Sequence, residues 1–250
     1  MNTIDRKNYH FSPSVNIVRD NGAQIDYILT PNAELVHSQL VTGFQIGVRA
    51  YNLVGAYGTG KSAFLKAFEN DIINLSNNFP NKSLSSFEFI KFIGEYTSLK
   101  KVFADFLKID NLSSQNIIKE IDYYYSKLNS GLIILIDEFG KFLEYAAQTN
   151  PEEELYFIQE LAEYVNDKNK NILFISTLHQ DFNQYAFNLS QAQKNEWDKV
   201  KGRLKEITFN EPVEQLLFLA AKRVDKLGFE NDNYNFETLF KVIQDSIYFH

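Results

Sequence analysis

The sequence predicts an α/β fold, a three-layer sandwich in which helices cover both faces of a parallel five-stranded sheet. Short apolar segments alternate with amphipathic ones along most of the 250 residues, and this order is typical of a parallel sheet. One segment, residues 131–138 (GLIILIDE), has five apolar residues in a row and is expected to be buried on both faces. A glycine-rich loop at residues 55–62 joins a strand to a helix.

Five strands are expected from short runs of β-branched, aromatic or aliphatic residues. Their ranges are 50–54, 87–93, 131–138, 172–177 and 207–209. The first strand leads directly into the glycine-rich loop, and the third ends in two acids. Ligands of an open parallel sheet gather at the carboxyl ends of its strands, so we expect both features at the same edge.

Helices are expected where apolar residues recur with a period close to 3.6. Such stripes run over residues 62–75, 99–107 and 117–128, so two helices separate the second strand from the third. An earlier helix is expected to start at residues 31 and 32, to continue to about residue 41, and to be ended by Gly43.

The second half of the chain contains three further helix signals. Residues 139–147 are expected to be helical. The next helix, 151 to about 165, begins with Asn150 as its cap, a proline, and three acids (152–154) at the positive end of the helix dipole. A last helix is expected to run from residue 210 to 228.

Composition and charge exclude several classes of function. The absence of cysteine excludes disulfides, thiolate zinc sites and cysteine nucleophiles. A net charge of −7 does not favour nucleic acid as a partner, because a domain that holds DNA usually needs a basic face. No signal peptide is visible, and the longest apolar run, 132–136, is too short to span a bilayer. We therefore expect a soluble, cytoplasmic protein.

The glycine-rich loop fits the pattern G-x-x-x-x-G-K-[ST] of a phosphate-binding loop. Its glycines allow backbone N–H groups to point at a phosphate, and the helix that follows adds its positive end. Lys61 would bridge the terminal phosphates, and the Ser62 hydroxyl would ligate magnesium. The residues expected to bind nucleotide are Gly55, Ala56, Tyr57, Gly58, Thr59, Gly60, Lys61, Ser62 and Ala63.

The acidic pair at the end of the third strand supplies the rest of the expected chemistry. Asp137 would hold magnesium opposite Ser62, and Glu138 would orient or deprotonate the attacking water. The sequence therefore predicts a nucleoside triphosphatase of the P-loop class that binds its nucleotide with Mg²⁺. ATP as that nucleotide follows only from the missing guanine motif and the family resemblance described below.

A GTPase is the first alternative, because residues 137–140 (DEFG) also satisfy D-x-x-G. A GTPase also needs an [NT]-K-x-D motif after a later strand. Residues 177–181 (TLHQD) offer no lysine at the required place, so we disfavour this class. Small-molecule kinases rarely pair a strand-end aspartate with an adjacent glutamate, and they rank lower too.

Four segments resemble the AAA+ ATPases, especially the replication-initiator and STAND-like branches. In order they are GAYGTGKS, LIILIDEFGKFLEYA, ILFISTLHQ and NEWDKVKGRLKEITFNEPVEQL, and together they cover about residues 27 to 228. The resemblance implies a polar sensor residue at the end of the fourth strand, either Thr177 or His179. It also implies a homo-oligomer in which Arg203 reaches the γ-phosphate of a neighbouring subunit, with an effect of about a thousandfold or more in rate.

The resemblance also suggests a domain organisation. Residues 1–26 would form an N-terminal extension, 27–210 the ATPase core, and 211–250 the start of a helical lid. Arg223 lies too early to be the lid's sensor arginine, so we expect the chain to be the N-terminal portion of a longer protein. Trp197 is expected to be a core or interface anchor.

Several functions remain open at this point. The segments GAYGTGKS, DEFGKFLEYA and NEWDKVKGRL resemble the corresponding sequences of ATPase subunits from bacterial anti-phage defence systems. This resemblance suggests a nuclease or other effector as partner. The leading expectation is an ATPase switch or motor. The alternatives are a nucleotide-dependent scaffold with little turnover and a DNA-loading initiator. Residues 27–32 are a candidate wall for adenine only by their position before the loop strand.

Overall fold

The computed structural model describes residues 15–73, 79, 84, 86–187 and 189–212, together with 215, 217, 219 and 220. The chain divides into two units, residues 1–210 and 211–250. All of the strands and helices discussed below belong to the first unit. The expected lid falls largely outside the described residues, as do Arg223 and Gly228, so the lid stays a prediction.

A five-stranded parallel sheet forms the centre of the first unit, and its strand order is β2-β3-β4-β1-β5. The strands are β1 (Ala50–Val54), β2 (Phe87–Ile93), β3 (Gly131–Asp137), β4 (Ile172–Leu178) and β5 (Lys205–Thr208). The predicted fold class is therefore confirmed. The fifth strand begins two residues before the predicted start, because Lys205 and Glu206 pair with Tyr51 and Asn52 of β1.

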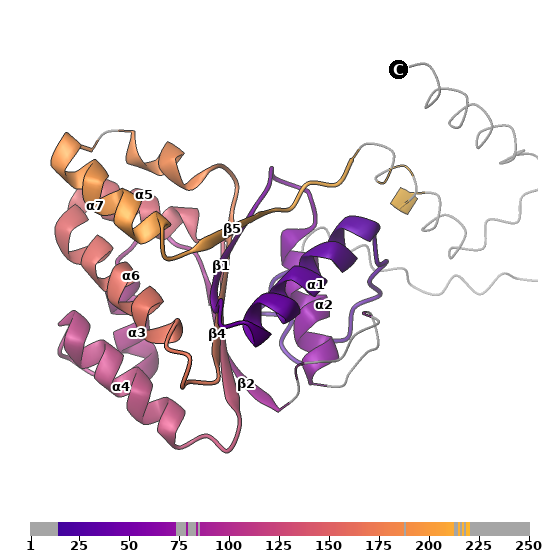
Figure 1. Ribbon diagram of the computed structural model, residues 1–250, viewed down its shortest axis with the longest axis horizontal. Coiled ribbons are helices and arrows are strands. Elements are labelled where there is room, and N and C mark those ends of the chain that lie inside the picture. The colour runs from indigo at the N-terminus through magenta and orange to yellow at the C-terminus, as the bar shows by residue number, and fades with distance from the viewer. Residues whose placement is uncertain are drawn as a thin grey trace, which may run out of the picture. The chain divides into compact units, whose positions relative to one another are not determined.

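Helices cover the two faces of this sheet (Figure 1). The first face carries α1 (Pro31–Gln45) and α2 (Lys61–Ile72). The second face carries α3 (Leu99–Leu107), α4 (Ser114–Ser126), α5 (Gly140–Thr149), α6 (Pro151–Val165), the short 3-10 helix η1 (Phe182–Ala186) and α7 (Gln191–Lys201).

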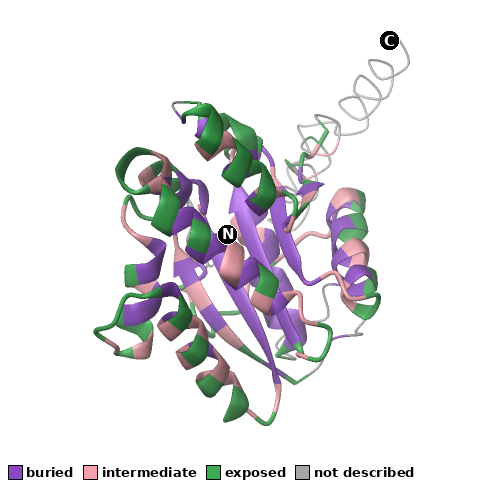
Figure 2. Ribbon diagram, turned by 60° about the vertical axis from the view of Figure 1, so that its left-hand side comes forward, coloured by how far each residue is buried: buried purple, intermediate pink, exposed green. Residues whose placement is uncertain are grey.

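Successive side chains of a strand point to opposite faces of the sheet, so each strand contributes to the core on both faces. On β3, Leu132, Ile134 and Ile136 join the cluster under α3–α7, whereas Ile133 and Leu135 join the cluster under α1 and α2. Every residue of β3 is buried, as its unbroken apolar run predicts. Figure 2 shows the strands buried between helices whose outer faces are exposed.

Trp197 is part of this core. Its side chain is buried under α7, and its indole N–H donates a hydrogen bond of 3.1 Å to the carbonyl of Phe182. Of the two predicted roles, core anchor and interface anchor, the contacts within the chain correspond to the first. Among the described residues, no helix has the length and apolar character needed to cross a membrane.

The start of α6 differs from its prediction. Asn150 precedes the helix, but its side chain makes no capping hydrogen bond. Glu154, one of the three acids of the first turn, is buried and serves the N-terminus of α3 instead. Its carboxylate accepts hydrogen bonds from the Ser98 hydroxyl (2.5 Å) and the Leu99 N–H (3.2 Å), and burial raises the pKa of this carboxyl group.

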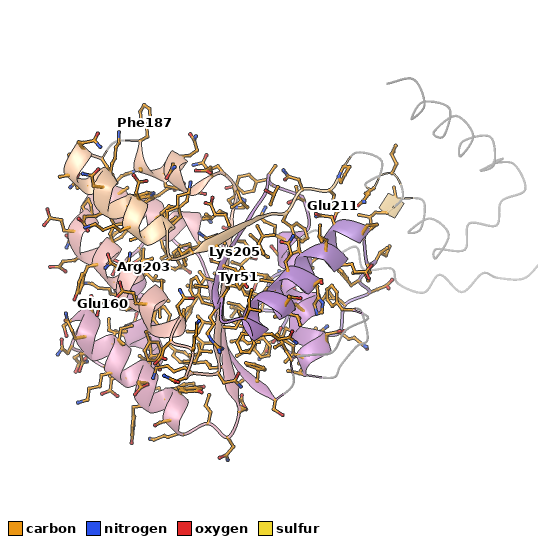
Figure 3. All side chains as sticks on the ribbon, in the orientation of Figure 1. Tyr51, Glu160, Phe187, Arg203, Lys205 and Glu211 are labelled. Carbon is orange, nitrogen blue, oxygen red and sulfur yellow. The ribbon has the colours of Figure 1, made fainter. Side chains whose placement is uncertain are left out.

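The prediction that Gly43 ends the first helix is wrong. Helix α1 continues to Gln45, and Gly43 lies buried in its last turns. A Cβ atom at this position would overlap the hydroxyl of Tyr51, a buried β1 residue labelled in Figure 3. The Tyr51 hydroxyl in turn donates a hydrogen bond of 3.1 Å to the Val48 carbonyl. Gly43 therefore permits close helix–strand packing and does not act as a stop signal.

Replacing Gly43 with alanine is expected to destabilise the protein. Alanine favours a helix interior by about 1 kcal/mol over glycine, but overpacking against Tyr51 costs about 1–3 kcal/mol and should exceed that gain. Thermal unfolding should occur several degrees lower than in the wild type. The double variant Gly43→Ala/Tyr51→Phe removes the overlapping hydroxyl and should recover part of the loss; a single variant as stable as the wild type would contradict this packing.

Candidate functional site

The glycine-rich loop connects the carboxyl end of β1 to the first residue of α2. Gly58 and Gly60 have φ angles of 79° and 90°, which side chains other than glycine rarely adopt. Gly60 occupies the N-cap position of α2, and no side chain caps that helix end. The first turn of α2 therefore presents its backbone N–H groups and its positive dipole end to the loop, as anion binding requires.

Lys61 lies inside this loop with only 5% of its surface exposed. Its ammonium donates hydrogen bonds to the carbonyls of Gly55 (2.5 Å) and Ala56 (2.7 Å) and to the Thr59 hydroxyl (3.3 Å). Burial lowers the pKa of Lys61, while the nearby Asp137 carboxylate acts in the opposite direction. The loop thus encloses a cation that is held by its own backbone oxygens.

The acidic pair stands at the carboxyl end of β3, and Thr177 of the neighbouring β4 organises it. The Thr177 hydroxyl donates a hydrogen bond of 2.6 Å to the buried Asp137 carboxylate and accepts one of 2.9 Å from the Glu138 N–H. The Glu138 backbone has a φ angle of 55°, an unusual conformation for a residue other than glycine. Thr177 therefore fixes both acids through hydrogen bonds.

His179 also follows β4, and its ring stacks on the ring of Tyr57 from the glycine-rich loop. The two ring centroids are 3.5 Å apart with an angle of 19° between the planes. Neither ring nitrogen of His179 has a hydrogen-bond partner among the described residues. Burial and, second, the Lys61 charge lower the pKa of His179. A neutral imidazole with two unpaired nitrogens consequently lies beside the loop lysine.

These groups surround one cavity of about 330 Å³. It is lined by residues 57–63 of the loop and α2, by Asp137 and Glu138, and by His179 and Val15. Sequence reasoning missed Val15, because a lone valine in a polar N-terminal segment gives no signal. A larger cavity of about 820 Å³ lies between the starts of α3, α4 and α6, and none of the predicted site residues lines it.

The proposed adenine wall, residues 27–32, does not line the smaller cavity. Thr30 instead accepts a hydrogen bond of 3.1 Å from the Ala33 N–H and caps α1, and Pro31 is the first residue of that helix. These residues start a helix because the cap side chain accepts a hydrogen bond from an N–H group of the first turn, and proline at the first helical position has no N–H group that needs a partner.

Arg203 lies apart from this cavity, in the turn between α7 and β5. Its guanidinium forms an ion pair with Glu163 of α6, with nitrogen–oxygen distances of 2.5 and 2.7 Å, and donates a further bond to the Lys199 carbonyl. Figure 3 shows Arg203 on the side of the sheet that carries α6. Within one chain, the arginine is thus bound to α6 and α7.

The predicted magnesium ligands both lie at the smaller cavity, because Ser62 and Asp137 belong to its lining. Among the described residues, no group of three or more histidine, aspartate, glutamate or cysteine side chains could hold a metal ion. A magnesium ion here would need phosphate and water oxygens in addition to these two residues, which is how magnesium is usually bound beside phosphates.

The solved structures that resemble the fold include two of the ORC2 protein of Aeropyrum pernix. The form described as ADPNP-ADP complexes matches with a TM-score of 0.54 and 14% identity, over 86% of this chain and 57% of that one. The ADP form matches with a TM-score of 0.53 and 14% identity, over 88% and 58%. A scan of protein-family models finds no match, and a search of curated proteins finds none either.

At this level of identity the likeness concerns the fold alone. The parallel five-stranded sheet and its flanking helices have the same fold as the matched part of the two ORC2 structures. The chain spans less than three fifths of the length of the two ORC2 structures, namely 57% and 58%.

Proposed function

We propose that this chain binds ATP with magnesium at residues 55–63 and hydrolyses the bond that links the terminal phosphate to ADP. One observation carries the proposal: the loop lysine, the acidic pair and His179 line the same cavity. The two ORC2 structures add support, since their descriptions name ADP and ADPNP. Adenine as the base rests on that likeness and on the missing guanine motif.

Each residue at the cavity has a role in this proposal. The α2 N-terminus and Lys61 hold the phosphates, while Ser62 and Asp137 hold magnesium, which neutralises charge on the phosphate oxygens. Glu138 takes a proton from the attacking water. The water oxygen bonds to the terminal phosphorus as the bond from that phosphorus to the bridging oxygen breaks, and ADP leaves with its electron pair.

Between Thr177 and His179, we assign phosphate sensing to His179. The Thr177 hydroxyl already donates to Asp137 and accepts from the Glu138 N–H, so it organises the acids. His179 lines the cavity, and its two ring nitrogens are buried without a hydrogen-bond partner among the described residues. A small rotation of the ring would let one of them donate a hydrogen bond to a phosphate oxygen. Its stacking on Tyr57 would couple its position to the glycine-rich loop.

Arg203 belongs to the proposal as a group acting in trans. Its side chain is paired with Glu163 and does not line the cavity of its own chain, so we assign it to the site of a neighbouring chain. To do so, the guanidinium must exchange Glu163 for a phosphate. Both are anionic oxygen acceptors suited to the planar fork of arginine, so the exchange replaces one charge-assisted contact with another.

Arg203→Ala is expected to lower ATP hydrolysis by about a thousandfold without weakening ATP binding. Mixing this variant with Lys61→Ala, which keeps its arginine, should restore activity. Each site combines the loop of one chain with the arginine of its neighbour. In an equal mixture with random association, about one site in four has both an intact loop and an intact arginine. Lys205→Ala, which changes a neighbouring exposed cation, is the control. A full rate for Arg203→Ala would exclude the role in trans.

The finer biological setting is also part of the proposal. We place the ATPase in a bacterial defence or other DNA-transaction complex, with a nuclease or other effector as partner. This rests on the sequences of residues 55–62, 137–146 and 195–204, which are similar to those of such ATPase subunits. The effector would be found by co-purification with the tagged chain in the presence of ATP and again in the presence of ADP; identical partners in both would contradict a nucleotide switch.

The central test is ATP turnover by the purified chain, with magnesium and with the metal chelated. Phosphate release that requires magnesium, together with ATP bound in preference to GTP, is the expected result. If the chain binds ATP tightly but releases no phosphate under any condition, the result would contradict hydrolysis and favour a nucleotide-dependent scaffold. Absence of nucleotide binding would overturn the proposal as a whole.

A further inference from the structure

Within the described residues, one ion pair holds the side chain of Glu138. The ammonium of Lys141, in the first turn of α5, lies 2.5 Å from the Glu138 Oε2 atom. The two residues are three positions apart, and their side chains are 45% and 33% exposed. The Glu138 carboxylate is therefore anchored through one oxygen at the rim of the cavity.

The backbone of Glu138 is fixed independently of this pair. Its N–H group donates to the Thr177 hydroxyl (2.9 Å) and to the Asp137 carboxylate (3.1 Å), and its carbonyl accepts the Lys141 N–H at 3.1 Å. These bonds set the direction in which the side chain leaves the chain. They leave its outer torsions undetermined, because rotation about side-chain bonds moves the carboxylate without moving the backbone.

Lys141 itself does not line the cavity formed by the described residues. The hydrogen bond to Glu138 is the largest cause of the raised pKa of Lys141, and the nearby Tyr57 and Glu144 add smaller effects in the same direction. Among the described residues, the ion pair with Glu138 is the contact that the lysine side chain makes with the site, and its charge adds a small effect to burial, which lowers the pKa of His179. This contact gives the lysine a way to act on the reaction by holding the glutamate.

We propose that Lys141 is a positioning residue for ATP hydrolysis: by pairing with one carboxylate oxygen, it aims the other oxygen of Glu138 at the attacking water. The inference rests on the proposed function, because it names what orients the group assigned as base. A base must lie within hydrogen-bond reach of the proton that it takes. A side chain held by a neighbouring charge keeps that geometry better than one free to rotate.

The test measures kcat and KM for ATP in the full chain carrying Lys141→Met, which keeps the length of the side chain and removes its charge. The expected result is a fall in kcat of about tenfold with KM changed by less than about twofold. This is less than the roughly hundredfold loss that a misplacement of about 1 Å can cause, since the Glu138 backbone stays fixed. Lys141→Arg should recover most of the rate.

A matched control is available at the opposite edge of the sheet. Lys170 pairs with Asp122 at 2.6 Å, next to the beginning of β4 and far along the strand from the glycine-rich loop. Lys170→Met removes a comparable ion pair and should leave both kcat and KM unchanged. Thermal unfolding of all variants separates loss of orientation from loss of fold.

A double variant completes the test. In Glu138→Gln the amide has no charge for Lys141 to pair with, so adding Lys141→Met should change the residual single-turnover rate by less than about twofold. An unchanged or increased kcat in Lys141→Met alone, or a higher KM with kcat intact, would overturn the inference and leave the proposed ATPase standing. A wild-type chain without turnover would overturn both.

Discussion

Glu138→Gln is expected to lower the rate of ATP hydrolysis by about a thousandfold while ATP remains bound. Loss of a positioned general base typically costs between about a hundredfold and ten-thousandfold. The amide keeps the size of the side chain and cannot accept the proton of the attacking water. The proposed contacts of magnesium and phosphate should be untouched, because Lys61, Ser62 and Asp137 are unchanged. The measurement is single-turnover phosphate release beside equilibrium binding of ATP.

The matched control for this variant is Glu144→Gln, the same chemical change on the exposed side of α5 six residues away. It should hydrolyse ATP at the wild-type rate. Because Thr177 binds the backbone N–H of Glu138 and not its side chain, the stability of Glu138→Gln should also be close to wild type. Hydrolysis within about tenfold of the wild-type rate would remove Glu138 from the role of base.

Lys61→Ala is expected to abolish ATP hydrolysis and to weaken ATP binding by about a hundredfold. A charge-assisted hydrogen bond contributes about 1.5–3 kcal/mol, and loss of a donor that stabilises transition-state charge costs about a further hundredfold or more in rate. Lys61 is buried in the loop and bonded to the Gly55 and Ala56 carbonyls, so its removal also loosens the loop itself. Calorimetric titration with ATP and a phosphate-release assay check both effects.

The control for the loop lysine is Lys101→Ala, which removes an exposed lysine on α3, outside the lining of the loop cavity. It should leave binding and turnover unchanged. If the two variants unfold at the same temperature, the loss of ATP binding and hydrolysis in Lys61→Ala comes from the site and not from unfolding. Undiminished hydrolysis by Lys61→Ala would refute the assignment of residues 55–63 as the nucleotide site.

The sheet could be predicted well because its signals are local. An unbroken apolar run identifies β3, and alternation between strand and helix patterns specifies a parallel sheet. The helix end at Gly43 could not be predicted, because glycine is also used where two elements approach closely. Only the position of Tyr51 against α1 reveals that reason.

The candidate site was predictable in its two motifs and not in their surroundings. Residues 55–62 and the pair Asp137–Glu138 carry fixed spacings that the chemistry itself requires. The Tyr57–His179 stack, the place of Val15 and the pairing of Arg203 with Glu163 are contacts between segments far apart in the chain. No local pattern encodes such contacts, because they depend on which strand ends meet at the sheet edge.

The sequence by itself therefore determined the fold class, the glycine-rich loop after β1 and the acids at the end of β3 that line the same cavity. The reason is that hydrophobic periodicity and motif spacing act over a few residues. The tertiary structure alone decided that Thr177 binds the Asp137 carboxylate and the Glu138 N–H, while the buried ring nitrogens of His179 have no partner in the part of the chain that the structure describes. It also decided that Lys141 holds Glu138. These roles depend on directions of side chains across neighbouring strands, which packing sets only once the whole sheet has formed.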